Sequence, residues 1–312
     1  MKVTSNLLKP LLTTGILTLS IFFAVEESAA QRAYMTQEFS VRDNSNIEVK
    51  TSGGSIEVIG TDSDQVQVEM YVKRRGDYLS PSEADLDDWE ITIEKEGNTV
   101  YAIAERENKN WGNWRGDNLS ISFKVYAPER SKTDLRTSGG SITMSDLQGD
   151  QLARTSGGSM TAERINGDIN LKTSGGSITI EEVEGSVDAN TSGGRIRASD
   201  VTGGINARTS GGSITLYNIA GNVEAKTSGG SIDAEIVDPD DFIELRTSGG
   251  SISIKVPKDN GFDVDLGGNR VRADLANFKG ELDKNDMEGT LNGGGTKLSA
   301  KTSGGSVRLS YF

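Results

Sequence analysis

Isoleucine and other apolar residues recur at a fixed spacing along this chain, each after the same short polar motif. The motif is Thr-Ser-Gly-Gly-Ser-Ile or a close variant, and it begins at Thr51, Thr137, Thr155, Thr173, Thr191, Thr209, Thr227, Thr247 and Thr302. The five successive gaps from Thr137 to Thr227 are 18 residues each. A repeat of this length is typical of a solenoid, in which each unit buries its apolar face only against its neighbours. The sequence therefore predicts a stacked column.

Two short runs of alternating apolar and polar residues occur in each repeat. In the unit that begins at Thr173, Ile178 and Ile180 form the first run, and Val187 and Ala189 form the second. Alternation at period two is the strand pattern, and 18 residues are too few for a paired-helix repeat. We therefore predict an all-β fold, a β-solenoid (β-helix) with 18-residue two-strand rungs.

Stacking the repeats in register predicts files of inward aliphatic side chains. The first file is Ile142, Met160, Ile178, Ile196, Ile214, Ile232 and Ile252. One rung departs from the pattern, because Gln151 takes an inward aliphatic position and Leu152 then faces outward. Nothing in the sequence explains this exchange.

Glycines mark two corners in every rung. Gly-Gly pairs follow each Thr-Ser, and single glycines recur at Gly149, Gly167, Gly185, Gly203 and Gly221. We expect positive φ and the missing Cβ to let the chain turn sharply there while rungs stack about 4.8 Å apart. A nucleotide-binding loop is excluded, because the required glycine spacing before a helix is absent from the sequence.

Residues 1–30 read as a signal peptide. Lys2 and Lys9 precede the uncharged apolar run 11–25, and small residues end at Ala30, where we expect cleavage. The run is 15 residues, short for a bilayer span of about 20. We therefore expect an exported protein, in the periplasm, at the cell surface or extracellular, with no transmembrane span in the mature chain; an uncleaved anchor is the alternative.

Residues 31–136 predict an N-terminal, β-rich cap region that contains the first rung. Ser80, Pro81 and Glu83 form the pattern of a capping box, which predicts a short helix ending near Trp89. The other expected elements are a strand at 65–72, a hairpin at 91–105 and a strand at 119–126. Residues 137–312 are the predicted solenoid array. We expect its last strand, 307–312, to end the column, with the terminal aromatic residues as a cap.

Composition argues against most enzyme classes. The chain has no His and no Cys, which removes the Ser/His/Asp arrangement, His-containing metal sites, thiol chemistry and a lipoprotein anchor. We therefore expect no catalytic residues, no metal and no cofactor. A pair of carboxylates could still cleave a polysaccharide, and the acidic residues 238–241 are a weak candidate for calcium; both alternatives stay open.

Charge limits the partners. The chain has 33 basic and 46 acidic residues, a net charge of −13, so long-range attraction to nucleic acid or anionic lipid is disfavoured. The acidity serves either solubility or a cation-binding surface.

Two outward features suggest ligand contacts. Trp111, Asn113, Trp114 and Arg115 lie in one predicted loop, where aromatic rings and a guanidinium could stack on a sugar or peptide; they could equally cover the end of the column. Ser and Thr also form ranks on one face, as in ice-binding solenoids, but Arg195 and Arg197 interrupt them. Long charged side chains disfavour that use.

The chain resembles the putative-adhesin family of bacterial exported β-strand-repeat proteins. The resemblance rests on the leader, the Thr-Ser-Gly-Gly-Ser-Ile rungs, the entry strand 121–128, and the closing Leu291 to Gly295 and Lys301 to Gly305. It covers about residues 40–312 and implies a β-solenoid with no catalytic residues. We expect a non-enzymatic adhesin-like protein that binds an unknown glycan or an envelope or surface protein. A periplasmic regulatory or sensory partner is the alternative, and oligomeric state stays open.

Overall fold

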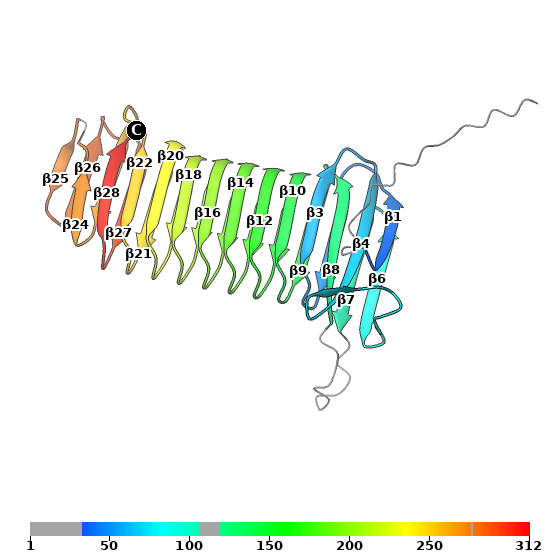
Figure 1. Cartoon of the computed structure of the whole chain (residues 1–312). Coiled ribbons are helices and arrows are strands. Elements are labelled where there is room, and N and C mark those ends of the chain that lie inside the picture. The colour runs from blue at the N-terminus through cyan, green and yellow to red at the C-terminus, as the bar shows by residue number, and fades with distance from the viewer. Residues whose placement is uncertain (1–32, 107–118, 276) are drawn as a thin grey trace, which may run out of the picture. The chain divides into compact units, whose positions relative to one another are not determined.

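The computed structural model describes residues 33–106, 119–275 and 277–312. These residues form 28 strands and no helix (Figure 1). The strands lie in two sheets of 14 strands each, which we call sheet A and sheet B. The all-β prediction is confirmed. The predicted signal peptide and the Trp111–Arg115 contacts lie outside the described residues. No described segment is a helix long and apolar enough to cross a membrane.

Sheet A runs in the order β1 (Met35–Ser40), β4 (Gln65–Arg74), β8 (Leu119–Pro128), β3 (Ile56–Thr61), β10 (Ile142–Gln148), β12 (Met160–Asn166), β14 (Ile178–Glu184), β16 (Ile196–Thr202), β18 (Ile214–Ala220), β20 (Ile232–Asp238), β22 (Ile252–Val256), β28 (Ser306–Tyr311) and β24 (Arg270–Ala273), with β5 (Asp77–Leu79) beside β4. Sheet B runs in the order β25 (Lys279–Leu282), β26 (Asp286–Leu291), β23 (Phe262–Gly267), β27 (Thr296–Thr302), β21 (Phe242–Thr247), β19 (Val223–Lys226), β17 (Ile205–Arg208), β15 (Val187–Asn190), β13 (Ile169–Lys172), β11 (Gln151–Arg154), β9 (Ser131–Thr137), β2 (Ser45–Thr51), β7 (Thr99–Arg106) and β6 (Trp89–Glu96).

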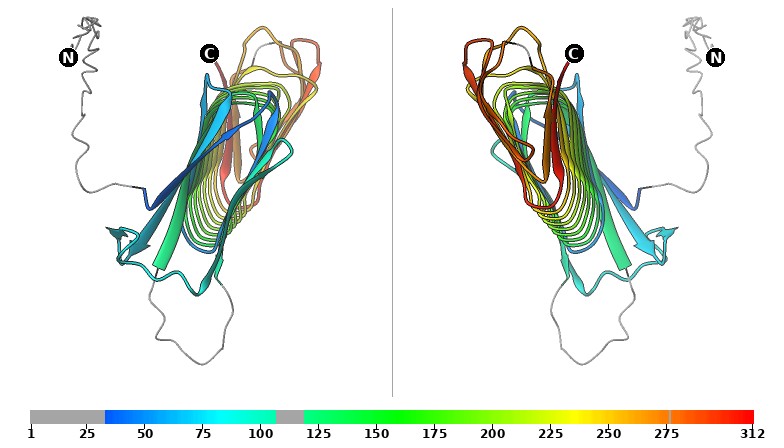
Figure 2. Two further views of the ribbon diagram at one scale, coloured as in Figure 1. Left: turned by 90° about the vertical axis from the view of Figure 1, so that its right-hand side faces the viewer. Right: turned by 90° about the vertical axis from the view of Figure 1, so that its left-hand side faces the viewer.

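Successive coils of the central column superpose in register. From β10 to β18 the strands of sheet A are parallel, and each residue pairs with the one 18 positions on, as Ile178 pairs with Ile196 and Ile196 with Ile214. All three side chains are 0% exposed. Figure 2 looks along the column and shows the coils one behind another. The predicted inward file is therefore confirmed, and it forms the core between the two sheets.

Threonine and glycine join the rungs at the first corner. The hydroxyl of Thr191 donates to the carbonyl oxygen of Gly176 at 2.8 Å and accepts from the amide of Gly194 at 3.3 Å. Gly176 does not adopt positive φ; a Cβ there would lie 1.9 Å from the carbonyl oxygen of Gly158. The expectation of positive φ is therefore wrong at the Gly-Gly corner, where close approach of two backbones requires glycine. It holds at the second corner, as at Gly185 with φ 150°.

Both ends of the column depart from sequence order. The rung β2–β3 lies between β7–β8 and β9–β10, and the rung β27–β28 lies between β21–β22 and β23–β24. The nine Thr-Ser-Gly-Gly corners are therefore contiguous in space. The prediction that 307–312 ends the column is wrong, because β24 covers β28. The physical reason is that the Thr302 hydroxyl donates to the carbonyl oxygen of Gly250 at 2.7 Å, which holds β27–β28 against β21–β22.

Turns replace the predicted helix at 80–89. Glu83 Oε2 accepts from the amide and the hydroxyl of Ser80, at 2.8 and 2.7 Å, so the capping contacts do form. Residues 81–83 and 87–88 are nevertheless turns. A helix of two turns is costly to nucleate, and here the Asp85 side chain bonds to the amide of Asp87 instead. The hairpin β6–β7 follows, with antiparallel pairing.

Gln151 has a structural explanation. It is 2% exposed, and its Nε2 donates to the carbonyl oxygens of Ser131 and Gly149 at 3.0 and 2.8 Å. Its Oε1 accepts from the Thr133 hydroxyl at 2.7 Å. The hydroxyl of Ser131 in turn bonds to the Pro128 carbonyl oxygen at 2.7 Å. This buried network satisfies backbone groups where the cap region meets the array.

Candidate binding groove

Five consecutive rungs of sheet A, from β10 to β18, bend at the same position. The residues there have φ between 53° and 61°, although none is glycine: Asp146, Arg164, Glu182, Asp200 and Asn218. The inward residues of β10 explain the bend, because Ile142 and Met144 are two apart but Leu147 follows after three. An extra outward residue is inserted, as in a β-bulge. For Arg and Glu this left-handed conformation costs on the order of 1 kcal/mol.

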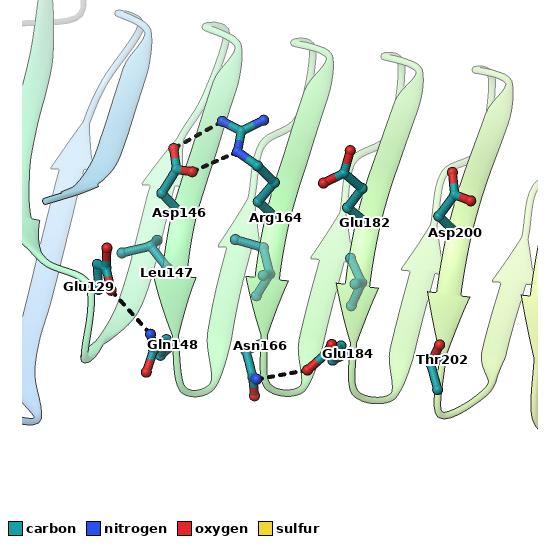
Figure 3. Close-up of a pocket in the computed structure, with 12 residues that line it drawn as sticks. Glu129, Asp146, Leu147, Gln148, Arg164, Asn166, Glu182, Glu184, Asp200 and Thr202 are labelled. Atoms are coloured by element: carbon teal, nitrogen blue, oxygen red, sulfur yellow. Dashed lines mark hydrogen bonds and ion pairs between the residues drawn. The ribbon is translucent and has the colours of Figure 1, made fainter.

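The bend creates a shallow groove across the strands. One rim is the column of left-handed residues, and the other is Gln148, Asn166, Glu184 and Thr202 (Figure 3). Leu147, Ile165 and Val183 form the floor, each at most 2% exposed. The hollow measures about 480 Å³. Because the strands are in register, similar positions recur along the groove from one rung to the next.

Carboxylates dominate the lining. Five of them line the groove, at Glu129, Asp146, Glu182, Glu184 and Asp200, against the single guanidinium of Arg164. Neutral partners hold three: Gln148 donates to Glu129 at 3.1 Å and Asn166 donates to Glu184 at 2.9 Å (Figure 3), and the amide of Asn218 donates to Asp200. Within the described part of the chain, the carboxylate of Glu182 has no hydrogen bond or ion pair. The groove is therefore negative and offers many hydrogen-bond acceptors.

Arg164 and Asp146 form the one strong ion pair of the groove. The guanidinium donates to both carboxylate oxygens, at 2.6 and 2.9 Å. These bonds lower the pKa of Asp146 and raise the pKa of Arg164. The bidentate geometry fixes one end of the groove.

The groove residues were not identified from the sequence. Their signal was the broken alternation between Met144 and Leu147, repeated in each rung. The ligand contacts predicted at Trp111, Asn113, Trp114 and Arg115 fall in 107–118, outside the described residues, and are therefore neither brought together nor separated.

Metal binding finds no support in residues 33–106, 119–275 and 277–312. These hold no group of three or more Asp, Glu, His or Cys placed to bind an ion. At the acidic segment 238–241, the carbonyl oxygen of Asp240 accepts from Thr296 at 2.6 Å, and the amide of Asp241 donates to Asn222. Backbone bonds thus position this segment beside its neighbours.

The hydroxyl ranks are interrupted as the sequence suggested. Thr161 pairs with Thr179, but Arg197 follows Thr179 and Asp233 follows Thr215 in the same outward rank. A continuous water-ordering plane is therefore missing from this part of sheet A.

Comparison with known proteins identifies a family. The Toastrack DUF4097 family matches residues 44–310. A "putative adhesin" from Bacteroides fragilis is 12% identical, covering 90% of this chain and 99% of that chain, with a TM-score of 0.37. A "putative adhesin" from Parabacteroides distasonis is 12% identical, covering 88% of this chain and 96% of that chain, with a TM-score of 0.42.

A "putative lipid binding protein" from Parabacteroides distasonis is 14% identical, covering 88% of this chain and 96% of that chain, with a TM-score of 0.32. Likenesses at these identities and TM-scores carry no functional argument. Among curated proteins, none matches this sequence.

Proposed function

Because this chain belongs to the Toastrack DUF4097 family, whose match spans residues 44–310, we propose a function in binding. The protein is a non-enzymatic, exported, adhesin-like β-solenoid that binds or scaffolds at the bacterial cell envelope or surface. In this proposal residues 1–30 are the leader, 31–136 the cap region with the first 18-residue rung, and 137–312 the solenoid array.

The observation that carries the proposal is the repeated groove of Figure 3. Equivalent polar positions recur at successive rungs from β10 to β16 above a buried aliphatic floor, and the rungs are about 4.8 Å apart. An extended ligand can therefore touch several rungs at once. Each contact is weak, but tethering many of them along one ligand multiplies the affinity. An enzyme would instead concentrate its chemistry in one place.

The ligand class that fits is a glycan or an extended envelope or surface protein. Carboxylate and amide groups on both rims, such as Glu182 and Asn166, suit sugar hydroxyls or basic side chains. In the same proposal, Trp111, Asn113, Trp114 and Arg115 add a contact at the cap region.

Changing the rung number tests the proposal. Deleting 173–190 removes one repeat, and duplicating the same segment adds one, while the register of neighbouring strands is kept. Isolated bacterial envelope material, namely peptidoglycan with its attached glycans, is fixed to a sensor surface. We expect dissociation to become faster with the deletion and slower with the duplication. Circular dichroism and the thermal midpoint verify that each variant is folded.

Other outcomes would replace the proposal. Affinity could prove independent of the number of rungs and yet be lost when 111–116 is exchanged for a neutral linker. That result would favour a regulatory or sensory partner that acts through the cap region. Turnover in a glycan-cleavage assay would favour a polysaccharide-active enzyme. Cell fractionation that finds the chain only in the periplasm would remove surface adhesion.

A further inference from the structure

A ladder of basic residues follows the edge of sheet B beside the Thr-Ser-Gly-Gly corners. Eight of the nine corners are preceded by a cation, at Lys50, Arg136, Arg154, Lys172, Arg208, Lys226, Arg246 and Lys301. These positions pair in register, as Arg154 does with Lys172. Like charges directly opposite each other on neighbouring strands repel, so each cation needs a nearby anion.

Acidic side chains neutralise six of the eight cations. Arg136 pairs with Asp134 at 2.6 Å, and Lys301 pairs with Asp265 at 2.6 Å. The remaining ion pairs are Lys50–Glu48, Arg208–Glu224, Lys226–Glu224, Lys226–Glu244 and Arg246–Glu244. Arg154 and Lys172 are the exceptions. Both are exposed, and neither forms an ion pair or side-chain hydrogen bond with any residue that the structure describes.

The gap arises from the outward residues two positions earlier. Asp134 occupies that position in β9 and Glu224 occupies it in β19, but β11 has Leu152 and β13 has Asn170. The anion is also missing before Arg208 and Lys301, where Asn206 and Ser299 stand, but these two cations pair with Glu224 and Asp265 of the neighbouring strand. Only β11 and β13 have neither kind of ion pair among the described residues. An apolar side chain and a neutral amide take the place of the anion there.

A hollow of about 540 Å³ lies next to the two cations on the same face of sheet B. Leu152 and Asn170, two positions before Arg154 and Lys172, line it, but the cations themselves do not. Its lining includes Leu152, Asn170 and Asn206, together with carboxylates that already have partners. Asp150 pairs with Lys132 at 2.7 Å, and Asp168 accepts from the amide of Ser186 at 2.9 Å. Asp188 accepts from the side chains of Asn170 and Asn190, at 3.2 and 2.8 Å. The lining carboxylates are thus not available to Arg154 and Lys172.

We propose that this hollow binds a carboxylate-bearing sugar of an acidic glycan. Arg154 and Lys172, beside the hollow, bind the carboxylate that extends from it. Within the hollow, Leu152 contacts the apolar face of the sugar ring, and the amides of Asn170 and Asn206 bind hydroxyls. Asn206 Oδ1 is buried without a hydrogen-bond partner among the described residues, so a ligand hydroxyl that enters here would satisfy it. The inference rests on the proposed binding function but uses a different surface from the groove of Figure 3.

An acidic peptide fits this surface less well. Extended peptides bind β-structure mainly by adding a strand to an open edge. Here β11, β13 and β15 are each paired on both sides, so no edge is open. A sugar that lies across the strands needs none.

The test uses oligogalacturonate as the probe and its methyl ester as the control. The two share one backbone and differ only at the carboxylates, where esterification adds a methyl group and removes the charge. We expect isothermal titration calorimetry on the full chain to show binding of the acid, weakened by salt, and little binding of the ester. Replacing the two free cations, Arg154→Gln with Lys172→Gln, lowers affinity about tenfold. Arg208→Gln, on the same ladder but paired with Glu224, leaves it within about twofold.

A second variant tests the same gap independently. Leu152→Asp supplies the anion that Asp134 gives to Arg136, so it should abolish binding of the probe while raising the thermal midpoint. Equal binding of the methyl ester, unchanged affinity in the double variant, or no binding of either probe would overturn the proposal. Poly-glutamate that binds as tightly as oligogalacturonate would replace the glycan by an acidic peptide. The two proposals can fail separately. If deleting or duplicating 173–190 leaves binding to envelope material unchanged while oligogalacturonate still binds, only the proposed function of the Figure 3 groove is overturned.

Discussion

The hydroxyl of Thr137 donates a hydrogen bond to the carbonyl oxygen of Gly54 at 2.8 Å, across 83 residues of sequence. Thr155 makes the same bond to Gly140, only 15 residues away. The stacking of corners thus continues across the insertion between Gly54 and Thr137 in the same way as between adjacent repeats. At the other end Thr302 bonds to Gly250, 52 residues earlier. One corner contact therefore determines which rungs are neighbours, whatever the chain does between them.

Removing one corner hydroxyl should destabilise the column. Thr191→Val keeps the shape of the side chain but loses the bond to Gly176 and leaves the amide of Gly194 without its acceptor. We expect the free energy of unfolding to fall by about 1–3 kcal/mol, measured by chemical denaturation. Thr191→Ser retains the hydroxyl and should stay close to wild type. Thr179→Val, on the outward side of β14, should change stability by less than about 0.5 kcal/mol; an equal loss there would refute the role of the corner bond.

The two glycines of one corner should respond oppositely to alanine. A Cβ at Gly176 would lie 1.9 Å from a backbone oxygen, whereas at Gly175 the nearest atom is 3.6 Å away. Gly176→Ala should therefore cost more than about 3 kcal/mol or prevent folding. Gly175→Ala should be neutral or slightly stabilising, since alanine restricts the unfolded chain. Thermal unfolding of both variants measures this difference. Equal melting temperatures for the two variants would contradict the prediction.

The Asp146–Arg164 pair predicts a pH dependence. The bonds from Arg164 lower the pKa of Asp146 in the folded protein, so the unfolded state takes up this proton first as pH falls. The stabilisation is present above the unfolded pKa of about 3.9 and is lost as pH falls through the lower folded pKa. Asp146→Asn should therefore melt below wild type at pH 6, and the difference should shrink toward pH 3. A constant difference in melting temperature across this range would contradict the assignment.

The inward files could be predicted because each rung repeats one alternation. Ile178 is buried for the same reason as Ile196 and Ile214, so a single pattern specifies the core. The left-handed bend at Glu182 follows from the same pattern, since an inward residue three positions after another requires an inserted one. The spacing of the inward residues alone, however, does not predict that the inserted residue bends the strand into a groove.

The order of the end rungs could not be derived from spacing alone. The 18-residue period states how far apart successive rungs are, but segments without the motif, such as 62–128, can lie on either side of their neighbours. The signal was chemical: Thr302 donates to Gly250 of another corner, and Gly54 of the first corner accepts from Thr137. Thr51 itself donates to Ile121, outside any motif. Likewise the capping box at Ser80 was real, but its contacts stabilise a turn as well as they begin a helix.

Disulfide cross-linking tests the central claim, that the Thr-Ser-Gly-Gly corners form one contiguous ladder. The chain has no cysteine, so any disulfide that forms must join the two engineered cysteines. Ser253 pairs in register with Arg308, and Arg308 with Arg272. Adjacent strands, about 4.8 Å apart, lie within disulfide range, and strands twice as far apart do not. Ser253→Cys with Arg308→Cys should therefore oxidise to a cross-linked chain by mass spectrometry, while Ser253→Cys with Arg272→Cys stays reduced. The opposite result would mean that the rungs stack in sequence order and would contradict the account.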